Sequence, residues 1–261
     1  MKDFRHKNIL FIGDAAHQVS PFGARGANSG IQDTDNLVWK LNLVVKGQAP
    51  ASLLDTYSQE RVYAADENLM NSTRSTDFIT PKSAVSKVFR NSVLELAKTL
   101  PFARSLVNSG RLSVPSYLYQ SSLNTPDIDQ FVGSMIPGAP IDDAPIEVNG
   151  KADWLLRHVG NQFSAVIYVE GAIDQSQLDL IDQASVNGIK ISPIVVSSTK
   201  QDHPSIKVLH DVKGLFKARF DAKPGTVYLV RPDQHVSARW RKLDSGLLKA
   251  ALAVSTGNGS K

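Results

Sequence analysis

The sequence contains no cysteine among its 261 residues. This absence excludes disulfide bonds, thiol catalysis and thiolate metal sites together. The chain also lacks an apolar run long enough to cross a bilayer, and its first residues, MKDFRHK, lack the apolar core of a signal peptide. We therefore expect a cytoplasmic protein that does not bind a membrane.

Paired metal-ligand spacings and nucleic-acid signatures are absent as well. Five of the six histidines are scattered without regular spacing, so no metal site is expected: His17, His158, His203, His210 and His235. The net charge is +4, and between positions 78 and 111 six basic residues accompany only Glu95. One interpretation is a nucleic-acid patch, but no aromatic–glycine signature accompanies it. A solvated helical face is therefore favoured, and no nucleic-acid partner is expected.

Residues 8–46 form the most chemically specific stretch of the sequence. Strand-forming residues from Asn8 to Ile12 lead into Gly13 and Asp14. The loop that we expect next carries Pro21, Gly23, Gly26 and Gly30. A helical pattern follows, with apolar residues on one side: Ile31, Val38, Leu41 and Val45. A strand that leads through a glycine-bearing loop into a helix N-terminus predicts a ligand site.

Asp14 and the first amides of that helix limit which ligand fits. At the carboxyl end of a strand, the Asp14 carboxylate can accept hydrogen bonds from the hydroxyl groups of a polyol; the alternative is a local turn residue. The amides near Ala27, Asn28 and Ser29 favour an anion or a partly negative carbonyl oxygen. A phosphate satisfies that requirement as well as a heterocycle does. The residues by themselves therefore predict a ligand that has a polyol chain and an anionic group that accepts hydrogen bonds from the amides.

The same stretch resembles a known family. The matching residues are GDAAH at 13–17, then Pro21, Gly23, Gly26, Asn28 and Gly30, then Asp33, Asn36, Leu37, Trp39, Lys40 and Leu41. They resemble the second flavin-binding motif of the FAD-dependent aromatic hydroxylases, which are flavoprotein monooxygenases of the phenol hydroxylase and 3-(3-hydroxyphenyl)propionate hydroxylase type. Further likeness lies in Leu53, Leu54, Asp55, Tyr57, Glu60 and Arg61, and in Asn108, Gly110, Arg111, Leu112 and Ser113.

The resemblance implies a set of site residues and partners. Asp14 would bind the ribityl hydroxyls of FAD, the backbone from Gly26 to Asn28 would face the pyrimidine edge of the flavin, and Pro21 would be the catalytic-site residue that lines the oxygen pocket. The implied cofactor-binding residues are Gly13, Asp14, Pro21, Gly23, Gly26, Ala27 and Asn28. Arg25 is expected either at a flavin or substrate oxygen or in solvent. The implied partners are NADH or NADPH, molecular oxygen, a small aromatic substrate and a second copy of the chain in a homo-oligomer.

The resemblance also implies that part of the enzyme is missing. The family begins with a βαβ unit whose G-x-G-x-x-G fingerprint holds the ADP half of FAD. The sequence contains no such fingerprint, and Met1 to Lys7 already resembles the approach to the strand before GDAAH. We therefore interpret the chain as the C-terminal portion of a longer hydroxylase. We expect the strand at Asn8 to Ile12 to have unpaired edges, and the chain alone to bind FAD weakly or not at all.

The rest of the chain predicts helices, a linker and a second domain. From Ser52 to Ser113 the pattern is helical, and the apolar residues after Pro81 are interpreted as packing core: Val85, Val88, Phe89, Val93, Leu96 and Leu100. Prolines and glycines between Leu112 and Gly150 indicate a linker. We expect helices at 151–158, 175–186 and 212–220, strands at 165–169, 189–196, 226–230 and 236–240, and a last helix from Asp244.

This order of elements resembles a thioredoxin fold, with Pro224 at the position of a cis proline. The predicted fold class is α/β: an incomplete FAD-binding domain segment (strand, flavin loop, helices) followed by a thioredoxin-like α/β domain. The predicted domains are residues 1–113, a linker at 114–145 and residues 146–261. Without a C-x-x-C pair the second domain cannot perform thioredoxin chemistry. One alternative function is a non-catalytic thioredoxin-like oligomerisation module with a remnant flavin motif; another is epoxidation on the same flavin scaffold.

Overall fold

The structure is a computed structural model that describes residues 1–19, 25–107 and 114–259. The chain forms two compact units. Unit 1 consists of Met1–Thr34 and Ser58–Ser116, and unit 2 consists of Asp35–Tyr57 and Tyr117–Lys261. The predicted domain boundaries stay a prediction, and the compact units divide the chain differently, because residues 35–57 and 117–145 group with the C-terminal sheet.

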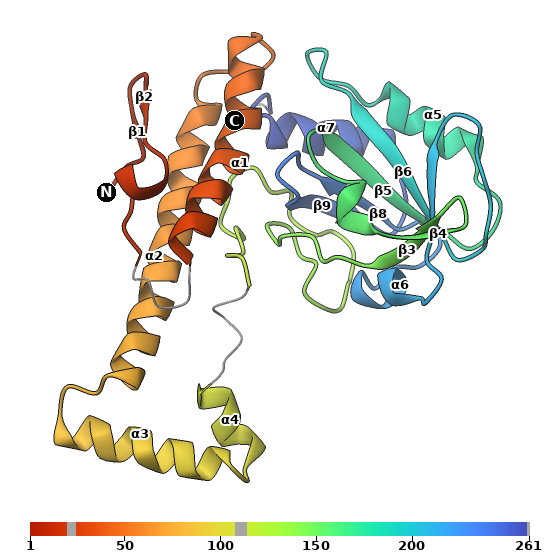
Figure 1. The fold of residues 1–261 in the computed structure, drawn as a ribbon. Coiled ribbons are helices and arrows are strands. Elements are labelled where there is room, and N and C mark those ends of the chain that lie inside the picture. The colour runs from red at the N-terminus through yellow and green to blue at the C-terminus, as the bar shows by residue number, and fades with distance from the viewer. Residues whose placement is uncertain (20–24, 108–113, 260–261) are drawn as a thin grey trace. The chain divides into compact units, whose positions relative to one another are not determined.

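Unit 1 opens with a short β-hairpin. Strand β1 (Arg5–His6) pairs antiparallel with β2 (Ile9–Leu10), and Lys7 in the turn has a φ of 54°. The expected strand at positions 8–12 is therefore only two residues long, and it pairs within the chain instead of remaining open. A 3₁₀ turn, η1 (Gly13–Ala15), follows directly. The hairpin is drawn in red beside the first two helices in Figure 1.

Helix α1 (Arg25–Val45) starts earlier than the glycine pattern predicted. Gly26 and Gly30 lie inside the helix and not in a loop, which corrects the sequence prediction. Gly30 has a clear packing reason to be glycine, since a Cβ there would lie 3.2 Å from the Cα of Gly13. The close approach of these two backbones fixes η1 against the second turn of α1.

The side of α1 that the apolar residues define is exposed, not buried. The exposed fractions are 67% for Ile31, 56% for Val38, 36% for Leu41 and 77% for Val45. The buried side carries polar residues, among them Asp33, Asn36 and Lys40. Their hydrogen bonds and ion pairs satisfy these groups inside the protein, so the apolar stripe Ile31, Val38, Leu41 and Val45 does not mark the buried side of α1.

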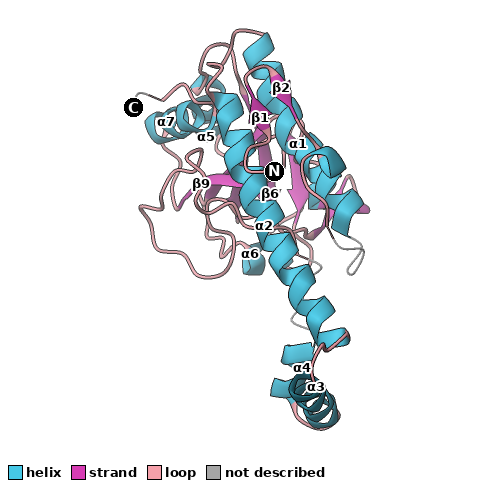
Figure 2. Ribbon diagram, turned by 90° about the vertical axis from the view of Figure 1, so that its left-hand side faces the viewer, coloured by secondary structure: helices cyan, strands magenta, loops and turns pink. Residues whose placement is uncertain are grey.

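Three more helices follow: α2 (Leu53–Ile79), α3 (Ala84–Ala97) and α4 (Pro101–Val107). Ser83 caps α3, because its hydroxyl oxygen accepts a hydrogen bond of 3.1 Å from the amide of Ser86. Pro101 occupies the first position of α4, where a missing amide hydrogen costs nothing. Figure 2 shows α3 and α4 packed beside each other at the C-terminal end of α2.

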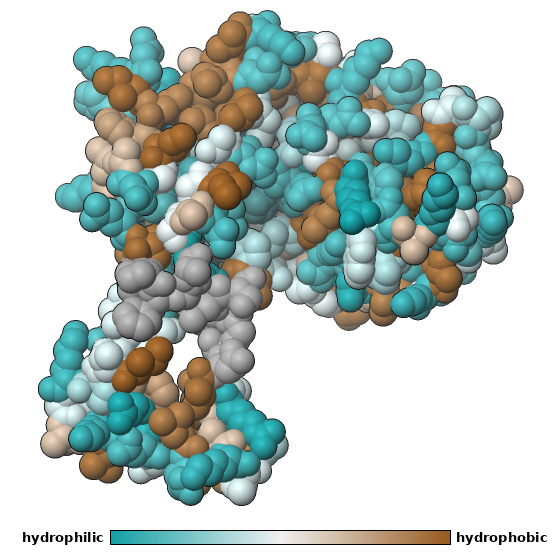
Figure 3. All heavy atoms as spheres, viewed as in Figure 1, coloured by the Kyte–Doolittle hydropathy of each residue, from teal (hydrophilic) through white to brown (hydrophobic). Residues whose placement is uncertain are grey.

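The apolar residues predicted as the core of this helical region are mostly exposed. Val93 is buried, but Val85, Val88 and Phe89 are 79%, 66% and 60% exposed. In the space-filling view, apolar side chains reach the surface in the region of α3 and α4 (Figure 3). The packing-core interpretation of this helical pattern is therefore wrong.

Unit 2 is built on a seven-stranded sheet with the order β4-β3-β7-β6-β5-β8-β9. The strands are β3 (Pro145–Val148), β4 (Lys151–Trp154), β5 (Phe163–Val169), β6 (Ile191–Ser197), β7 (Lys207–His210), β8 (Val227–Val230) and β9 (Val236–Trp240). β5, β6 and β7 are parallel, and on the other side of β5 strand β8 runs antiparallel to β5 and β9 runs antiparallel to β8. The βαβ–ββα order confirms the predicted thioredoxin-like α/β domain.

Helices and chain segments cover both faces of this sheet (Figure 1). All seven residues of β5 are buried, as expected for a strand covered on both sides. One face packs against α5 (Gln175–Gln183), α7 (Ser245–Ser255) and Trp39 of α1. The other face packs against α6 (Leu215–Arg219) and the segment around Met135 to Ala144. The last helix was predicted correctly, since Asp244 caps α7 by accepting from the amide of Leu247 at 2.9 Å.

The expected helix at 151–158 is wrong. Residues Lys151–Trp154 form β4, and a 3₁₀ turn, η3 (Leu155–Arg157), follows. β4 pairs with β3 across a two-residue turn made of Asn149 and Gly150, which have φ values of 51° and 77°. Asn-Gly is the strongest short-range signal for such a hairpin. The Asn-Gly pair therefore indicates this hairpin in the sequence, whereas the apolar spacing of 151–158 by itself also fits a helix.

Pro224 is trans, because the described residues contain no cis peptide bond. It lies in a turn closed by a hydrogen bond of 2.8 Å from the amide of Thr226 to the carbonyl of Lys223. Gly225, the next residue, has a φ of +87°. Proline followed by a glycine of positive φ is typical of a type II turn with a trans bond. The predicted cis proline is therefore wrong.

Asp233, in the turn between β8 and β9, and Arg239 of β9 are only 4% exposed each. Arg239 donates to the carboxylate of Asp127, with a shortest distance of 2.6 Å. Asp233 accepts from the guanidinium of Arg231 at 2.5 Å and from the side-chain amide of Asn36 at 3.0 Å. Asn36 in turn accepts from the ammonium of Lys40 at 2.9 Å. This buried network is one reason why the second half of α1 belongs to unit 2.

We predict that Gly138→Ala lowers the free energy of unfolding of unit 2 by about 3 kcal/mol. Gly138 has a φ of +91°, and a Cβ would lie 2.5 Å from the carbonyl carbon and oxygen of Leu118. The matched control is Gly214→Ala, where φ is +63° but a Cβ meets nothing within 4 Å. The control should cost only about 1 kcal/mol, from the backbone conformation alone. Urea unfolding followed by tryptophan fluorescence measures both; equal costs would contradict the steric argument.

Candidate functional site

The centre of unit 1 is a buried carboxylate. Asp33 is 0% exposed, and three donors from different segments converge on it. The Gly13 amide donates to it at 2.9 Å, the His17 imidazole nitrogen Nε2 lies 2.7 Å from it, and the Arg61 Nε donates at 2.7 Å. We call Asp33, Gly13, His17 and Arg61 the Asp33 cluster. The cluster ties η1 and the segment after it to α1 and α2.

The Asp33 cluster holds its carboxylate ionised. Burial alone would raise the pKa of Asp33, but the hydrogen bond from His17 and the positive charge of Arg61 outweigh burial, so the pKa lies below its usual value. Arg61 also donates to the carbonyl oxygen of Ser29 at 3.3 Å, which fixes it to the second turn of α1. Buried ion pairs of this kind are rigid, because each partner is costly to expose or to leave unpaired.

Asp14 lies on the rigid turn that the Asp33 cluster positions. Its side chain is exposed. No group within the described parts of the chain donates a hydrogen bond to its carboxylate. Because Gly13 is held by Asp33 and packed against Gly30, the next residue is presented outward from a fixed backbone. A carboxylate presented in this way on a rigid turn can accept hydrogen bonds from ligand hydroxyls.

The first turn of α1 carries the other described residues that were predicted for the ligand site. Gly26 is partly exposed, Ala27 and Asn28 are exposed, and a Cβ on Gly26 would meet nothing within 4 Å. The first amides of a helix have no acceptor within the helix and carry partial positive charge. These residues therefore fit a group with a polyol chain beside Asp14 and a partly negative carbonyl edge beside the helix N-terminus. FAD has both features.

Arg25 is in neither of the places expected for it. It is 8% exposed, donates to the side-chain oxygen of Asn68, and donates at 3.1 Å to the carbonyl of Val114. Asn68 also donates to the hydroxyl of Ser29 at 3.0 Å. Burial lowers the pKa of Arg25, and the nearby Glu67 carboxylate opposes that shift. Arg25 thus anchors the first turn of α1 to α2 instead of reaching out to a ligand.

The structure positions part of the predicted site. Gly13, Asp14, Gly26, Ala27 and Asn28 lie in η1 and in the first turn of α1, with Asp14, Ala27 and Asn28 exposed. The predicted residues Pro21 and Gly23 lie outside the described residues. Asp33 and Arg61 carried the resemblance in the sequence, but no role could be given to them there. A buried role for these charged residues becomes visible only when three chain segments come together.

In the portions of the chain that the structure describes, no helix combines the length and apolar character needed to span a membrane. Within the same portions, no three histidine, aspartate or glutamate side chains are grouped as they would be around a metal ion.

Comparison with known protein families gives two matches. Residues 1–72 match the family described as "FAD binding domain", and residues 147–253 match the family described as "HcaD C-terminal domain". The first range contains the Asp33 cluster, Asp14 and the first turn of α1. The second range covers the whole thioredoxin-like sheet apart from the first two residues of β3.

Curated relatives are hydroxylases of aromatic acids. The 3-(3-hydroxy-phenyl)propionate/3-hydroxycinnamic acid hydroxylase of Mycolicibacterium gilvum is 28% identical over 97% of this chain and 46% of its own length. The enzyme of the same name from Escherichia coli O157:H7 is 28% identical over 90% of this chain and 43% of its own length. The chain therefore spans less than half the length of the curated relatives it matches.

Solved structures share the fold. The flavin-dependent monooxygenase PieE, in complex with FAD and substrate, superposes with a TM-score of 0.70 at 20% identity, over 98% of this chain and 48% of that one. Aklavinone-11 hydroxylase, in a ternary complex with FAD and aklavinone, gives a TM-score of 0.69 at 20% identity, over 97% and 44%. These likenesses support the fold of both units. The predicted family resemblance is confirmed by the curated relatives and family matches.

Proposed function

We propose that this chain, which matches the C-terminal portion of the FAD-dependent aromatic hydroxylases, forms the flavin-facing half of a monooxygenase site. The complete enzyme would hydroxylate a phenolic or related aromatic substrate with NADH or NADPH and molecular oxygen. The supporting observation is the exposed Asp14 carboxylate, which the Asp33 cluster holds on a rigid turn against α1. When bound, FAD would supply the redox chemistry, and the protein would position and shield it.

The residues of this chain would bind and orient the cofactor. The Asp14 carboxylate would accept hydrogen bonds from the ribityl hydroxyl groups. The backbone amides from Gly26 to Asn28 would stabilise negative charge at the pyrimidine edge of the ring, where a helix N-terminus is favourable. Pro21 would line the pocket where oxygen meets the flavin, and Gly23 would let the loop approach the ring closely.

We further propose that the chain alone holds FAD weakly and does not turn over. It has no G-x-G-x-x-G fingerprint for the ADP half of the cofactor. The exposed side of α1, with Ile31 and Val45 at 67% and 77%, is apolar surface of the kind that packs against other protein. The predicted homo-oligomer stays a prediction.

Binding of flavin fragments to the purified chain tests the proposed site. Riboflavin carries the ring and the ribityl chain, whereas lumiflavin carries the ring alone. We expect riboflavin to bind roughly 5- to 20-fold more tightly than lumiflavin, because charge-assisted hydrogen bonds to Asp14 contribute about 1 to 2 kcal/mol. Asp14→Ala should remove this preference. Flavin fluorescence gives the affinities, and amide NMR shifts should be confined to Gly13, Asp14 and residues 26–28.

The matched control is Asp66→Ala, which removes another exposed carboxylate of unit 1. It should leave the riboflavin preference unchanged. Equal affinities for riboflavin and lumiflavin in the wild-type chain would contradict the role of Asp14, and the non-catalytic thioredoxin-like oligomerisation module would then be the better interpretation. Separately, FAD should bind no more tightly than riboflavin. A purified chain that is yellow with stoichiometric flavin would contradict the proposed weak binding.

A further inference from the structure

Asn-Gly pairs occur three times in the chain, at 149–150, 187–188 and 258–259. Asparagine followed by glycine is prone to spontaneous deamidation, because glycine has no side chain to hinder the attack of its amide nitrogen on the asparagine side chain. All three pairs lie in unit 2. Their covalent chemistry is the same, so the contacts that each pair makes in the folded chain decide which of them reacts.

The reaction needs no reagent other than water. The glycine amide nitrogen forms a bond to the side-chain carbonyl carbon of asparagine, and the side-chain nitrogen takes up the amide proton and leaves as ammonia. Water then opens the resulting cyclic imide at either of its carbonyl groups. The products are aspartate, and isoaspartate, in which the main chain is longer by a methylene group. No group is oxidised or reduced.

Asn149 and Asn187 occupy the same kind of turn. The turn at 149–150 has φ values of 51° and 77°, and the turn at 187–188 has φ values of 48° and 77°. The first turn joins β3 to β4, and the second precedes β6. The residues of both turns are exposed. Backbone conformation and exposure are therefore matched, and the hydrogen bonds of the side chains distinguish the two sites.

The side chain of Asn187 is held in place, whereas that of Asn149 is not. The Asn187 Nδ2 donates to the side-chain oxygen of Asn258 at 3.0 Å and to the carbonyl of Gln48 at 3.4 Å. The Gln48 side chain in return donates to the carbonyl of Asn187 at 3.3 Å. In the described parts of the chain the Asn149 side chain forms no hydrogen bond. Its amide group can therefore rotate toward the nitrogen of Gly150.

The third pair, Asn258 and Gly259, is held at both reacting groups. The Asn258 Nδ2 donates to the carbonyl of Gln48 at 2.9 Å. The Gly259 amide nitrogen, which is the attacking atom, donates to the carbonyl of Ala253 at 2.9 Å. This hydrogen bond has to break before the nitrogen can attack. Among the described residues, none accepts a hydrogen bond from the corresponding amide of Gly150.

The place of each turn in the sheet increases the difference between Asn149 and Asn187. Attack requires the turn to leave its closed conformation, so the reaction follows local opening. β4 is the outermost strand of the described sheet and lies beside β3, whereas β6 lies between β5 and β7. Strands with fewer neighbours open at a lower free energy than central strands. The turn at 149–150 should therefore open more often than the turn at 187–188.

We propose that Asn149 is the residue at which this chain deamidates spontaneously, and that the contacts among Gln48, Asn187 and Asn258 protect the other two Asn-Gly pairs. The isoaspartate product lengthens the turn between β3 and β4, so the present register of that hairpin is lost. The modification changes one edge of the sheet in unit 2 and does not depend on the proposed flavin site.

Peptide mapping by mass spectrometry, on purified chain aged in mildly alkaline buffer, tests the proposal. In the folded chain we expect Asn149 to convert about 10-fold faster than Asn187 or Asn258, because hydrogen bonds at the latter two must break first. In urea the three sites should convert at similar rates, since the protecting contacts are lost. Labelling by an isoaspartyl methyltransferase identifies the isoaspartate product. Equal rates in the folded chain, or the same difference in urea, would overturn the proposal.

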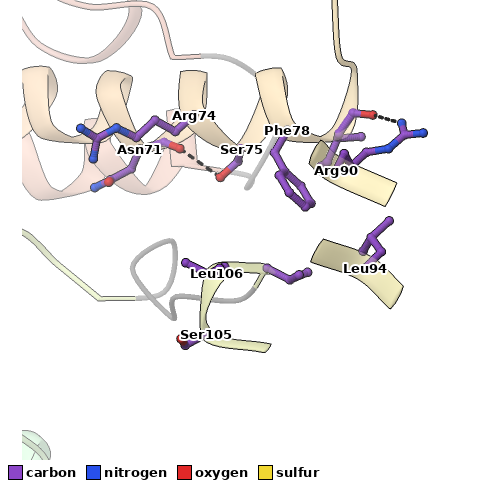
Figure 4. Close-up of a pocket in the computed structure, with 10 residues that line it drawn as sticks. Asn71, Arg74, Ser75, Phe78, Arg90, Leu94, Ser105 and Leu106 are labelled. Carbon is purple, nitrogen blue, oxygen red and sulfur yellow. Dashed lines mark hydrogen bonds between the residues drawn. The ribbon is translucent and has the colours of Figure 1, made fainter. Parts of the chain in front are cut away.

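An asparagine inside a helix gives an internal control. Asn71 of α2 is 8% exposed and is followed by Ser72. It borders a pocket of about 730 Å³ between α2, α3 and α4, and its backbone carbonyl accepts a hydrogen bond of 3.0 Å from the hydroxyl of Ser75 (Figure 4). The amide that follows it is bonded within the helix and is not available for attack. Conversion of Asn71 as fast as Asn149 would contradict the role of local structure.

Two substitutions test the protection of Asn187 directly. Asn258→Ala removes the closest acceptor of the Asn187 side chain and should speed the conversion of Asn187 about threefold, while leaving that of Asn149 unchanged. Gln183→Ala is the matched control, because it removes an exposed side-chain amide of α5 that forms no hydrogen bond in the described parts of the chain. It should change neither rate. An unchanged Asn187 rate in Asn258→Ala would overturn the protective role of these contacts.

Discussion

Asp33→Ala is expected to lower the free energy of unfolding of unit 1 by about 3 to 5 kcal/mol, because it leaves the Arg61 guanidinium buried without its counter-charge. Arg61 and Asp33 have side chains that are 4% and 0% exposed, and their shortest contact is 2.7 Å. The substitution also removes the acceptor for the Gly13 amide and for His17. Urea unfolding followed by far-ultraviolet circular dichroism measures the loss, since unit 1 is largely helical.

An exposed ion pair of the same unit gives the control. Asp77 pairs with Lys82 at 3.0 Å, but their side chains are 52% and 83% exposed. Asp77→Ala should therefore change the stability by no more than about 1 kcal/mol. A loss in Asp33→Ala that is no larger than the loss in the control would contradict the structural role of the Asp33 cluster.

The Asp33 cluster also gives unit 1 a defined acid sensitivity. The pKa of Asp33 is lower in the folded chain than in the unfolded chain. A carboxyl group of this kind stabilises the folded state above its unfolded pKa of about 4, and this contribution is lost as the pH falls through the folded pKa. The wild-type unit should therefore lose stability below about pH 4, and Asp33→Ala should lack this part of the pH dependence.

Asp233→Ala is expected to have a similarly large effect on unit 2, about 3 to 5 kcal/mol. The Arg231 side chain is 0% exposed, and the Asp233 carboxylate lies 2.5 Å from it. Without Asp233, the guanidinium remains in the interior with no opposite charge from the β8–β9 turn. The three tryptophans of the chain, Trp39, Trp154 and Trp240, all lie in unit 2, so their fluorescence reports this transition.

The surface pair Glu170–Lys217 is the matched control for Asp233. It joins the two side chains at 2.7 Å, with exposed fractions of 36% and 52%. Glu170→Ala should cost about 1 kcal/mol or less.

Burial raises the pKa of Asp233, but the Arg231 and His235 charges more than offset it and hold that pKa well below its usual value. The contribution of Asp233 to the stability of unit 2 is therefore also present above about pH 4 and lost at lower pH. A midpoint of unfolding of unit 2 that does not change as the pH is lowered would contradict this expectation.

The flavin-motif resemblance could be found in the sequence because its residues are close together. Gly13, Asp14, Gly26 and Asn28 fall within sixteen consecutive positions, and their local order already implies a turn followed by a helix N-terminus. The thioredoxin-like order of strands and helices was likewise readable from short apolar runs and turn residues. Local patterns of this kind can be recognised in the sequence because each depends only on residues a few positions away.

The sequence by itself determined the class of fold, the resemblance of the stretch around Asp14 to a flavin-binding motif, and the absence of thiol chemistry. Tertiary structure alone decided which side of α1 is buried, that Arg25 anchors α2, and that Asp33 binds Gly13, His17 and Arg61 together. It also decided that the apolar residues of α3 and α4 stay exposed around a pocket. The physical reason is that burial depends on partners far away in the chain. A charged residue can be buried when a residue of opposite charge pairs with it, and an apolar residue stays exposed when no other segment packs against it.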